Sequence, residues 1–145
     1  MFKRILAAYD GSPESSRALL TGIHLAKSLI AELRAIYVHE RLSMDAGFIG
    51  AAVSGGTVLA CQQAFQCYRF LEASAHQTAR QEGVFLKTEF VEGDEVQRIV
   101  ERVERARSDL LVLGINRHPT FLSRMWHHAA HDLSQQVVSS FLAVR

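Results

Sequence analysis

The alternation of short apolar runs with longer segments of helical period is the feature of this sequence that most constrains its fold. Apolar runs at 4–9, 34–39, 84–91, 109–114 and 140–145 have the length of buried strands, and longer segments separate them. This order is typical of β-α-β units, in which helices connect parallel strands. The sequence therefore predicts one α/β domain over residues 1–145, with five strands and four helices.

The segments between these runs carry helix signals and one loop signal. The predicted helices are one that Ser12 caps and Pro13 opens, one from about 57 to 81, one that Asp94 caps, and one from about 128 to 138. The 57–81 helix is expected to pack one face inward, formed by Cys61, Ala64, Phe65, Tyr68, Leu71 and Ala75. The segment 41–56 contains four glycines and fits neither period, which predicts a long mobile loop.

Charge and cysteine content exclude several classes of protein. Sixteen basic and fifteen acidic residues are mixed along the chain, which argues against a surface for nucleic acid. No segment approaches about 20 consecutive apolar residues, so no membrane span is expected. Cys61 and Cys67 lie six apart in one predicted helix, where their thiols point in different directions. Partly buried, unpaired cysteines are therefore expected, and the cytoplasm is the natural compartment.

The carboxyl ends of the strands are where a sheet of this kind binds its ligand, at the point where the strand order reverses. For the order 3-2-1-4-5, this point lies between the strands at 4–9 and 109–114. Asp10 directly follows the strand at 4–9, and Gly114 is the last residue of the strand at 109–114. The two residues are expected to face each other. The Asp10 carboxylate has two possible roles, as a ligand contact or as a cap for the helix that begins at Pro13.

Four stretches together resemble the universal stress protein family over nearly the whole chain: "ILAAYDGSPESSRALLTGIHLA", "AIYVHE", "DLLVLG" and "SQQVVSSFLAVR". The resemblance implies an open five-stranded parallel sheet, order 3-2-1-4-5, with helices on both faces, and a homodimer joined through the last strand. In nucleotide-binding members, an aspartate matching Asp10 and the backbone near Val38 hold the adenosine.

The phosphates in those members lie on a pattern of Gly, two residues, Gly, nine residues, Gly, then Ser or Thr. Gly114 matches the first glycine, but Arg117, His127 and His128 stand at the other three positions. Glycines let backbone N–H groups approach a phosphate, so arginine and histidine are expected to crowd that loop. The Arg117 side chain can still contact phosphate directly. The substitutions are therefore expected to change how phosphate is bound, and they do not by themselves exclude the ligand.

The histidines and the rest of the chain give no positive case for catalysis or for a metal. His127 and His131 lie four apart, but no third ligand is near in sequence, so they are expected to fill space and not to hold a physiological metal. A nucleophile elbow, a zincin motif and a paired-acid arrangement are all absent from the sequence. The leading hypothesis is a stress-response module that binds a small ligand or partner protein, with weak or absent ATP binding. The alternative is a nucleotide-dependent switch or slow ATPase that binds ATP or AMP through Arg117 and the loop histidines.

Overall fold

The computed structural model describes residues 1–39, 53–115 and 131–145, with only the backbone described at 53–62 and 64. Its labelled elements are β1 (Arg4–Ala8), α1 (Pro13–Leu29), β2 (Glu32–His39), α2 (Val53–Gln81), β3 (Leu86–Glu92), α3 (Glu95–Arg105), β4 (Leu110–Gly114) and β5 (Ser140–Val144). Residues 131–136 form a further helical segment. The predicted alternation of strands and helices is therefore present.

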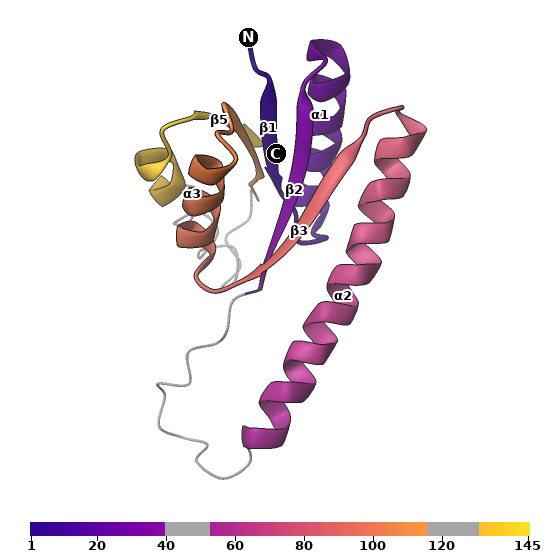
Figure 1. The fold of residues 1–145 in the computed structure, drawn as a ribbon, viewed down its shortest axis with the longest axis vertical. Helices are drawn as coiled ribbons and strands as arrows, with labels where there is room; N and C mark the ends of the chain where they lie inside the picture. Colours follow the sequence, from indigo (N-terminus) through magenta and orange to yellow (C-terminus); the bar gives the residue numbers. More distant parts are fainter. Residues whose placement is uncertain (40–52, 116–130) are drawn as a thin grey trace.

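The five strands form one parallel sheet in the order β3-β2-β1-β4-β5 (Figure 1). Ala7 of the central strand β1 lies opposite Ala35 of β2 on one side and Val112 of β4 on the other. The α/β fold with strand order 3-2-1-4-5, expected from the sequence, is confirmed. The strand order reverses between β1 and β4, and because β1 ends at Ala8, the reversal point lies beside the residues that follow Ala8.

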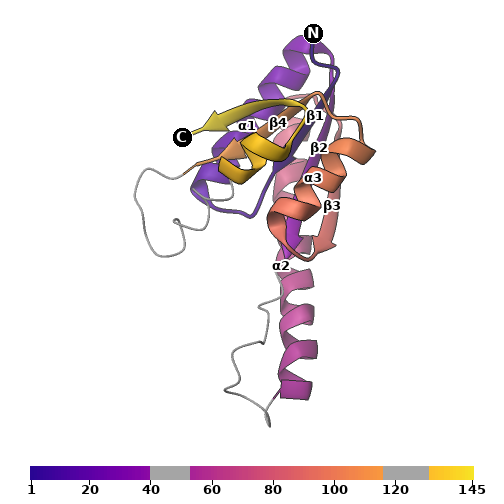
Figure 2. The ribbon, with the colours of Figure 1, turned by 90° about the vertical axis from the view of Figure 1, so that its left-hand side faces the viewer.

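Helices cover both faces of the sheet, as Figures 1 and 2 show. Alternate residues of β1 point to opposite faces, as in any strand. Ile5 and Ala7 join a core with α1 and α2, whereas Leu6 and Ala8 join a core with α3 and Leu133 of the 131–136 segment. All four residues are at most 3% exposed, which explains why β1 is a continuous apolar run in the sequence.

The caps of α1 and α3 are those that the sequence predicts. Ser12 has extended backbone angles and its hydroxyl accepts a hydrogen bond from the N–H of Ser15, with Pro13 at the first helical position. Asp94 caps α3 in the same way, through a 2.9 Å hydrogen bond from the N–H of Gln97. Both caps fix where a helix begins at the carboxyl edge of the sheet.

The α2 helix differs from its prediction in its start and in what it buries. It begins at Val53, so residues 53–56, expected to belong to the loop, are helical, while 40–52 lie outside the described residues. Its N-terminal part extends beyond the strands in Figure 1. Tyr68 and Ala75 pack inward as expected, but Phe65 is 50% exposed.

The expected partial burial of both cysteines is wrong for Cys67, which is exposed. The inward stripe of α2 passes through Tyr68, Ala75 and Ala79, which lie seven and four residues apart. Cys67 is one residue from Tyr68, about 100° around the helix, and this rotation carries its side chain away from the sheet. The side chain of Cys61 lies outside the described residues.

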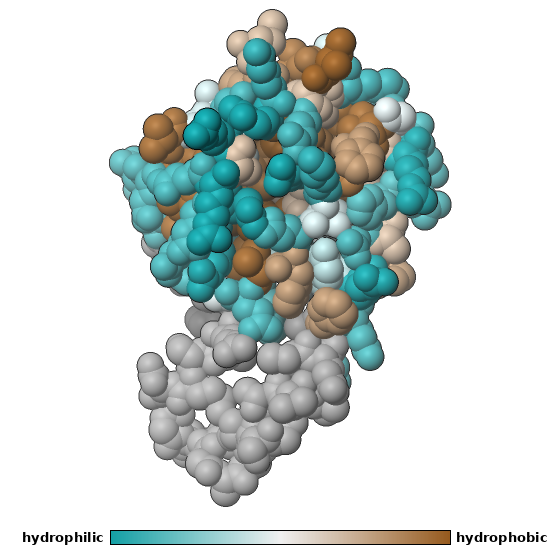
Figure 3. All heavy atoms as spheres, viewed as in Figure 1, coloured by the Kyte–Doolittle hydropathy of each residue, from teal (hydrophilic) through white to brown (hydrophobic). Residues whose placement is uncertain are grey.

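The outer surface of α3 is polar. Ile99 and Val103 are buried, whereas Glu104 and Arg105 are exposed, and hydrophilic side chains dominate the face shown in Figure 3. Arg102 forms an ion pair with Glu89 of β3, which ties this helix to the sheet. None of the helices with described residues is long and apolar enough to cross a membrane.

Candidate functional site

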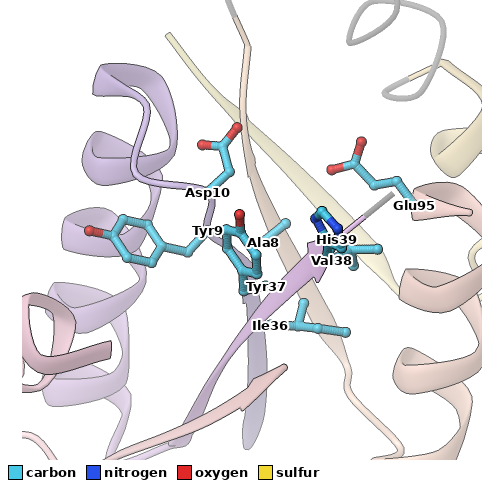
Figure 4. Close-up of a pocket in the computed structure, with 8 residues that line it drawn as sticks. All are labelled: Ala8, Tyr9, Asp10, Ile36, Tyr37, Val38, His39 and Glu95. Atoms are coloured by element: carbon cyan, nitrogen blue, oxygen red, sulfur yellow. The ribbon is translucent and has the colours of Figure 1, made fainter. Parts of the chain in front are cut away.

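A cleft of about 320 Å³ opens at the carboxyl ends of β1 and β2 (Figure 4). Three segments line it: residues 8–10 at the end of β1, residues 36–39 of β2, and Glu95 at the start of α3. Ligand pockets in proteins begin at about this volume, so the cleft has room for a small ligand such as a nucleoside. It lies at the edge of the sheet where the sequence predicts a ligand site.

The turn that follows β1 fixes the position of Asp10. One carboxylate oxygen of Asp10 accepts a 2.9 Å hydrogen bond from the N–H of Ser12, and the Asp10 N–H donates to the hydroxyl of Ser15. Gly11 has φ +83°, a conformation that side chains disfavour, and a Cβ there would lie 2.5 Å from the Leu71 side chain of α2. The turn is therefore held by its own hydrogen bonds and by α2 above it.

Of the two predicted roles of Asp10, the structure gives the helix cap to Ser12 and leaves the ligand contact to the Asp10 carboxylate. Its Oδ1 holds the turn before α1, while Ser12 is the cap itself. The carboxylate lines the cleft, and Figure 4 shows it at the open side of the β1 end. Its Oδ2 atom accepts no hydrogen bond from the described residues, so it can accept one from a ligand hydroxyl or amine.

The Val38 backbone faces the cleft because β2 is longer than β1. The carbonyl of Ile36 accepts a hydrogen bond from Tyr9 on the β1 side, and the carbonyl of His39 accepts one from Gly93 on the other side. Backbone groups two residues apart along a strand point the same way, so Val38 presents its N–H and C=O toward the space beyond the end of β1. A neighbouring donor and acceptor of this kind match the hydrogen-bonding edge of a nucleobase.

Aromatic rings support the β2 side of the cleft. Phe90 of β3 stacks on Tyr37 at 5.7 Å and on His39 at 6.3 Å between ring centroids. The Tyr68 ring of α2 lies 5.1 Å from Phe90 and 6.1 Å from Tyr37, so these three rings form one cluster. Burial first, and then the ionisable groups of Cys67 and Asp10, raise the pKa of the Tyr37 phenol. The Tyr37 phenol is therefore protonated at neutral pH, and its hydroxyl can donate a hydrogen bond.

Gly114 lies against α1 and does not line the cleft. A Cβ at Gly114 would be 2.4 Å from the carbonyl carbon and oxygen of Glu14 and 2.6 Å from the nitrogen of Ser15. The glycine therefore permits β4 to approach the first turn of α1. The structure brings Asp10 and Val38 together, while Arg117, His127 and His128 lie outside the described residues.

Glu95 is a cleft residue that the sequence reasoning missed. It is the first residue of α3, and Figure 4 shows its carboxylate across the cleft from Asp10. The signal was present, because a helix that follows a strand of this sheet begins at the carboxyl edge. His131 is exposed, and within the described parts of the chain no three His, Cys, Asp or Glu residues are grouped to hold a metal.

Comparisons with known proteins agree with this fold. A model of the universal stress protein family matches residues 1–145. Universal stress protein MJ0531 of Methanocaldococcus jannaschii is 31% identical over 114 residues, 79% of this chain and 65% of that protein, so this chain spans just under two-thirds of its length.

Solved structures of such proteins share the architecture at lower identity. Universal stress protein UspA from Lactobacillus plantarum has a TM-score of 0.81 at 19% identity, covering 99% of this chain and 98% of that one. A universal stress protein from Archaeoglobus fulgidus, solved in complex with dAMP, has a TM-score of 0.69 at 13% identity, covering 100% and 98%. At these identities the likeness shows the fold.

Proposed function

Because this chain belongs to the universal stress protein family, we propose that it is a cytoplasmic stress-response module whose cleft binds an adenine nucleoside or nucleotide, with weak or absent binding of ATP. Binding of the ligand, with or without a partner protein, is the whole of this role, and no catalytic step is required. The base would lie against the Val38 backbone and the ribose against Asp10.

One observation carries this proposal: the fold places the Asp10 carboxylate and the Val38 backbone in the same cleft of about 320 Å³. A nucleobase needs a donor and an acceptor side by side, and a ribose needs an acceptor for its hydroxyls. The cleft offers both. The Archaeoglobus fulgidus structure with dAMP supports an adenine ligand for a protein of this fold.

Weak ATP binding follows from the sequence of the phosphate pattern. Arginine and histidine at positions 117 and 127 replace glycines, and each strained or blocked loop position costs about 1 to 3 kcal/mol. One charge-assisted contact from Arg117 returns about 1.5 to 3 kcal/mol, and neutral histidines return less. The two unfavourable loop positions outweigh the one favourable contact from Arg117, so ATP binding is expected to be weak. A shorter ligand such as AMP keeps its contacts to Asp10 and Val38.

Calorimetric titration with adenosine tests the cleft. Asp10→Asn keeps the oxygen that accepts from Ser12 but removes the charged acceptor, so adenosine is expected to bind about tenfold more weakly. Asp132→Asn is the matched control, because it makes the same change at an exposed residue of the 131–136 segment. Equal adenosine affinity in wild type and Asp10→Asn would refute the assigned role of Asp10.

The ATP part of the proposal has its own test. The triple variant Arg117→Gly, His127→Gly, His128→Ser restores the family pattern and is expected to bind ATP more tightly than the wild type. Mass spectrometry of ligand released from freshly purified wild type should find no ATP. Micromolar ATP binding by the wild type that the variant loses would instead support the nucleotide-dependent switch or slow ATPase.

A homodimer through β5 is the second part of the proposal. β5 is the edge strand of the sheet, and edge strands pair readily with a second copy. The Ser140 N–H and the Val144 carbonyl bond to the β4 side, so the alternate residues Phe141 and Ala143 point their backbone groups outward.

Ala143→Pro removes one outward N–H and leaves the groups that pair with β4 intact. Light scattering at micromolar concentration should give the dimer mass for the wild type and the monomer mass for the variant. The Ala143→Ser variant, which keeps the N–H, should remain a dimer. A monomeric wild type would exclude this assembly.

A further inference from the structure

The sheet face that α3 covers changes character along β2 and β3. Toward the carboxyl ends of these strands, Ile36, Val38 and Val91 pack into the same core as the apolar side of α3. Alternate residues of a strand share a face, so charged residues nearer the amino ends lie on this face as well. They are Glu32 and Arg34 of β2 and Lys87 and Glu89 of β3. All four are half-buried or exposed, so this half of the face meets solvent.

One carboxylate of this face is shared by two cations. The Oε1 atom of Glu32 accepts from the Nη2 of Arg34 and from the Nζ of Lys87, each at 2.8 Å. A single negative charge therefore holds two positive side chains, one on each strand. Both cations keep N–H groups that these bonds do not use, because a guanidinium has five and an ammonium has three.

The last turn of α3 brings two more arginines to this face. Arg102 pairs with Glu89 of β3, and Arg105 follows it three residues later on the same side of the helix. Burial first, and then the nearby positive charges of Arg34 and Arg105, lower the pKa of the Arg102 guanidinium. Arg105 is exposed and forms no ion pair with the described residues.

Four cations thus share two carboxylates on what we term the basic surface. It consists of Arg34, Lys87, Arg102 and Arg105, with Phe85 beside them. Phe85 belongs to this face because its neighbours Val84 and Leu86 pack into the core on the other face. Its ring is 77% exposed, which offers an apolar contact next to the positive charges.

The extent of the basic surface favours a chain segment over a single small anion. Phe85 and Glu89 are four residues apart, which is about 13 Å along an extended strand. One phosphate group contacts only part of such a surface. An extended segment with several carboxylates and an apolar side chain matches both its charges and its ring.

We propose that the basic surface is a docking site for an acidic segment of a partner protein, whose apolar side chain lies on Phe85. A second copy of this chain is a poor fit, because the same surface on both copies would bring like charges together. The surface is on the β3 side of the sheet, and β5 is the opposite edge, so the proposed dimer leaves it accessible. It is also separate from the cleft, which lies at the other end of β2.

Fluorescence anisotropy with a labelled peptide tests this docking site. The probe is a peptide of about ten residues in which Asp and Glu flank one Leu, long enough to cross the surface. A second probe carries Asn and Gln in place of the acids. We expect the acidic peptide to bind the wild type about tenfold more tightly, the size of two or three exposed charge pairs. NaCl at about 500 mM should remove most of this difference, because salt screens exposed charges.

Arg105→Glu tests whether the positive charge acts locally. Arg105 has no ion pair in the described structure to lose, and we expect the variant to bind the acidic peptide about fivefold more weakly, from one attraction lost and one repulsion gained. Arg80→Glu is the matched control. Arg80 is also an exposed arginine in the last turn of a helix, but α2 covers the other face of the sheet. This control should change the peptide affinity less than about twofold.

Phe85→Ser tests the apolar contact without changing any charge. We expect the acidic peptide to bind about fivefold more weakly, because the Leu side chain loses the ring that it covers. Phe70→Ser is the matched control, since Phe70 of α2 is exposed to a similar degree, 75%. It should leave the peptide affinity unchanged.

Three outcomes would overturn the docking site. They are an acidic peptide that fails to bind the wild type at millimolar concentration, an equal loss in Arg80→Glu and Arg105→Glu, and tighter binding of a single-stranded RNA of the same charge. Adenosine titration separates this proposal from the proposed function, because Arg105→Glu should bind adenosine as the wild type does. A wild type that binds the peptide but not adenosine would overturn only the function of the cleft. Thermal unfolding of each variant checks that it is folded.

Discussion

Replacing Gly114 with alanine is expected to destabilise the fold even when no ligand is present. The added Cβ would lie 2.4 Å from two backbone atoms of Glu14 and 2.6 Å from the Ser15 nitrogen. These atoms belong to the first turn of α1, which the Ser12 cap and the Asp10 turn hold in place. Backbone atoms cannot move aside as the end of a flexible side chain can, so α1 and β4 must separate.

The magnitude follows from what overpacking costs in a close-packed core. One extra methyl group costs about 1 to 3 kcal/mol, and the upper half of this range applies here because the overlap is with backbone. We therefore expect Gly114→Ala to lower the free energy of unfolding by about 2 to 3 kcal/mol. For a chain of this size, this is roughly a 6 to 12 °C decrease in Tm.

Urea denaturation followed by circular dichroism measures this change, with Gly22→Ala as the matched control. A Cβ at Gly22, in the middle of α1, would meet Leu33 at an ordinary contact distance of 3.4 Å, so the helix preference for alanine should leave it neutral or stabilising. A Gly114→Ala variant within about 0.5 kcal/mol of the wild type would refute the packing role of Gly114.

Three further changes test other parts of the fold. Ile30 ends α1 with φ 54°, so Ile30→Gly should raise the free energy of unfolding by up to about 1 kcal/mol in urea denaturation, and a loss would contradict this. Burial alone would raise the pKa of Asp109, but hydrogen bonds from the N–H groups of Lys3 and Arg4 outweigh burial and lower this pKa. The contribution of the Asp109 carboxylate to folding stability is therefore full above about pH 4 and is lost as pH falls through the lowered pKa. Asp109→Asn should therefore unfold more easily at pH 7 by about 1 to 2 kcal/mol and match the wild type near pH 2, whereas a gap that persists there would exclude ionisation as the cause. Asp94→Ala should cost about 1 kcal/mol through the lost cap of α3, measured by thermal unfolding, and an unchanged Tm would contradict it.

The central strands were predictable from sequence because they are buried on both faces. Ile5, Leu6, Ala7 and Ala8 form an unbroken apolar run, which is the pattern of an interior parallel strand. The start of β3 was placed at residue 84, two residues before Leu86. Val84 instead donates its N–H to the carbonyl of Ala79, so it belongs to the end of α2 and not to the strand.

The start of β2 was placed at residue 34, two residues late, for a different reason. Glu32 is polar, and nothing in its sequence neighbourhood marks it as part of a strand. Its carboxylate pairs with Arg34 and with Lys87 of β3, 55 residues away. A charge that is stabilised across strands is visible only when the sheet is formed, because periodicity within one segment does not include its neighbours.

The candidate site was predictable in part. Asp10 and Val38 were placed by topology together with the family resemblance, and both line the cleft. Glu95 was not singled out in the sequence, because an acid in the first turn of a helix is already explained by the helix dipole. Its second role depends on where α3 sits relative to β2, which a local signal does not contain.

The contact between Gly114 and α1 also bears on how this position changes over evolution. A residue whose Cβ would overlap the Glu14 backbone is retained by selection for folding, whatever the chain binds. We therefore expect selection for folding to retain this glycine even in a chain whose other phosphate-pattern positions have changed. Glycine at this position therefore marks the junction of α1 and β4, and its presence in a relative carries little information about phosphate.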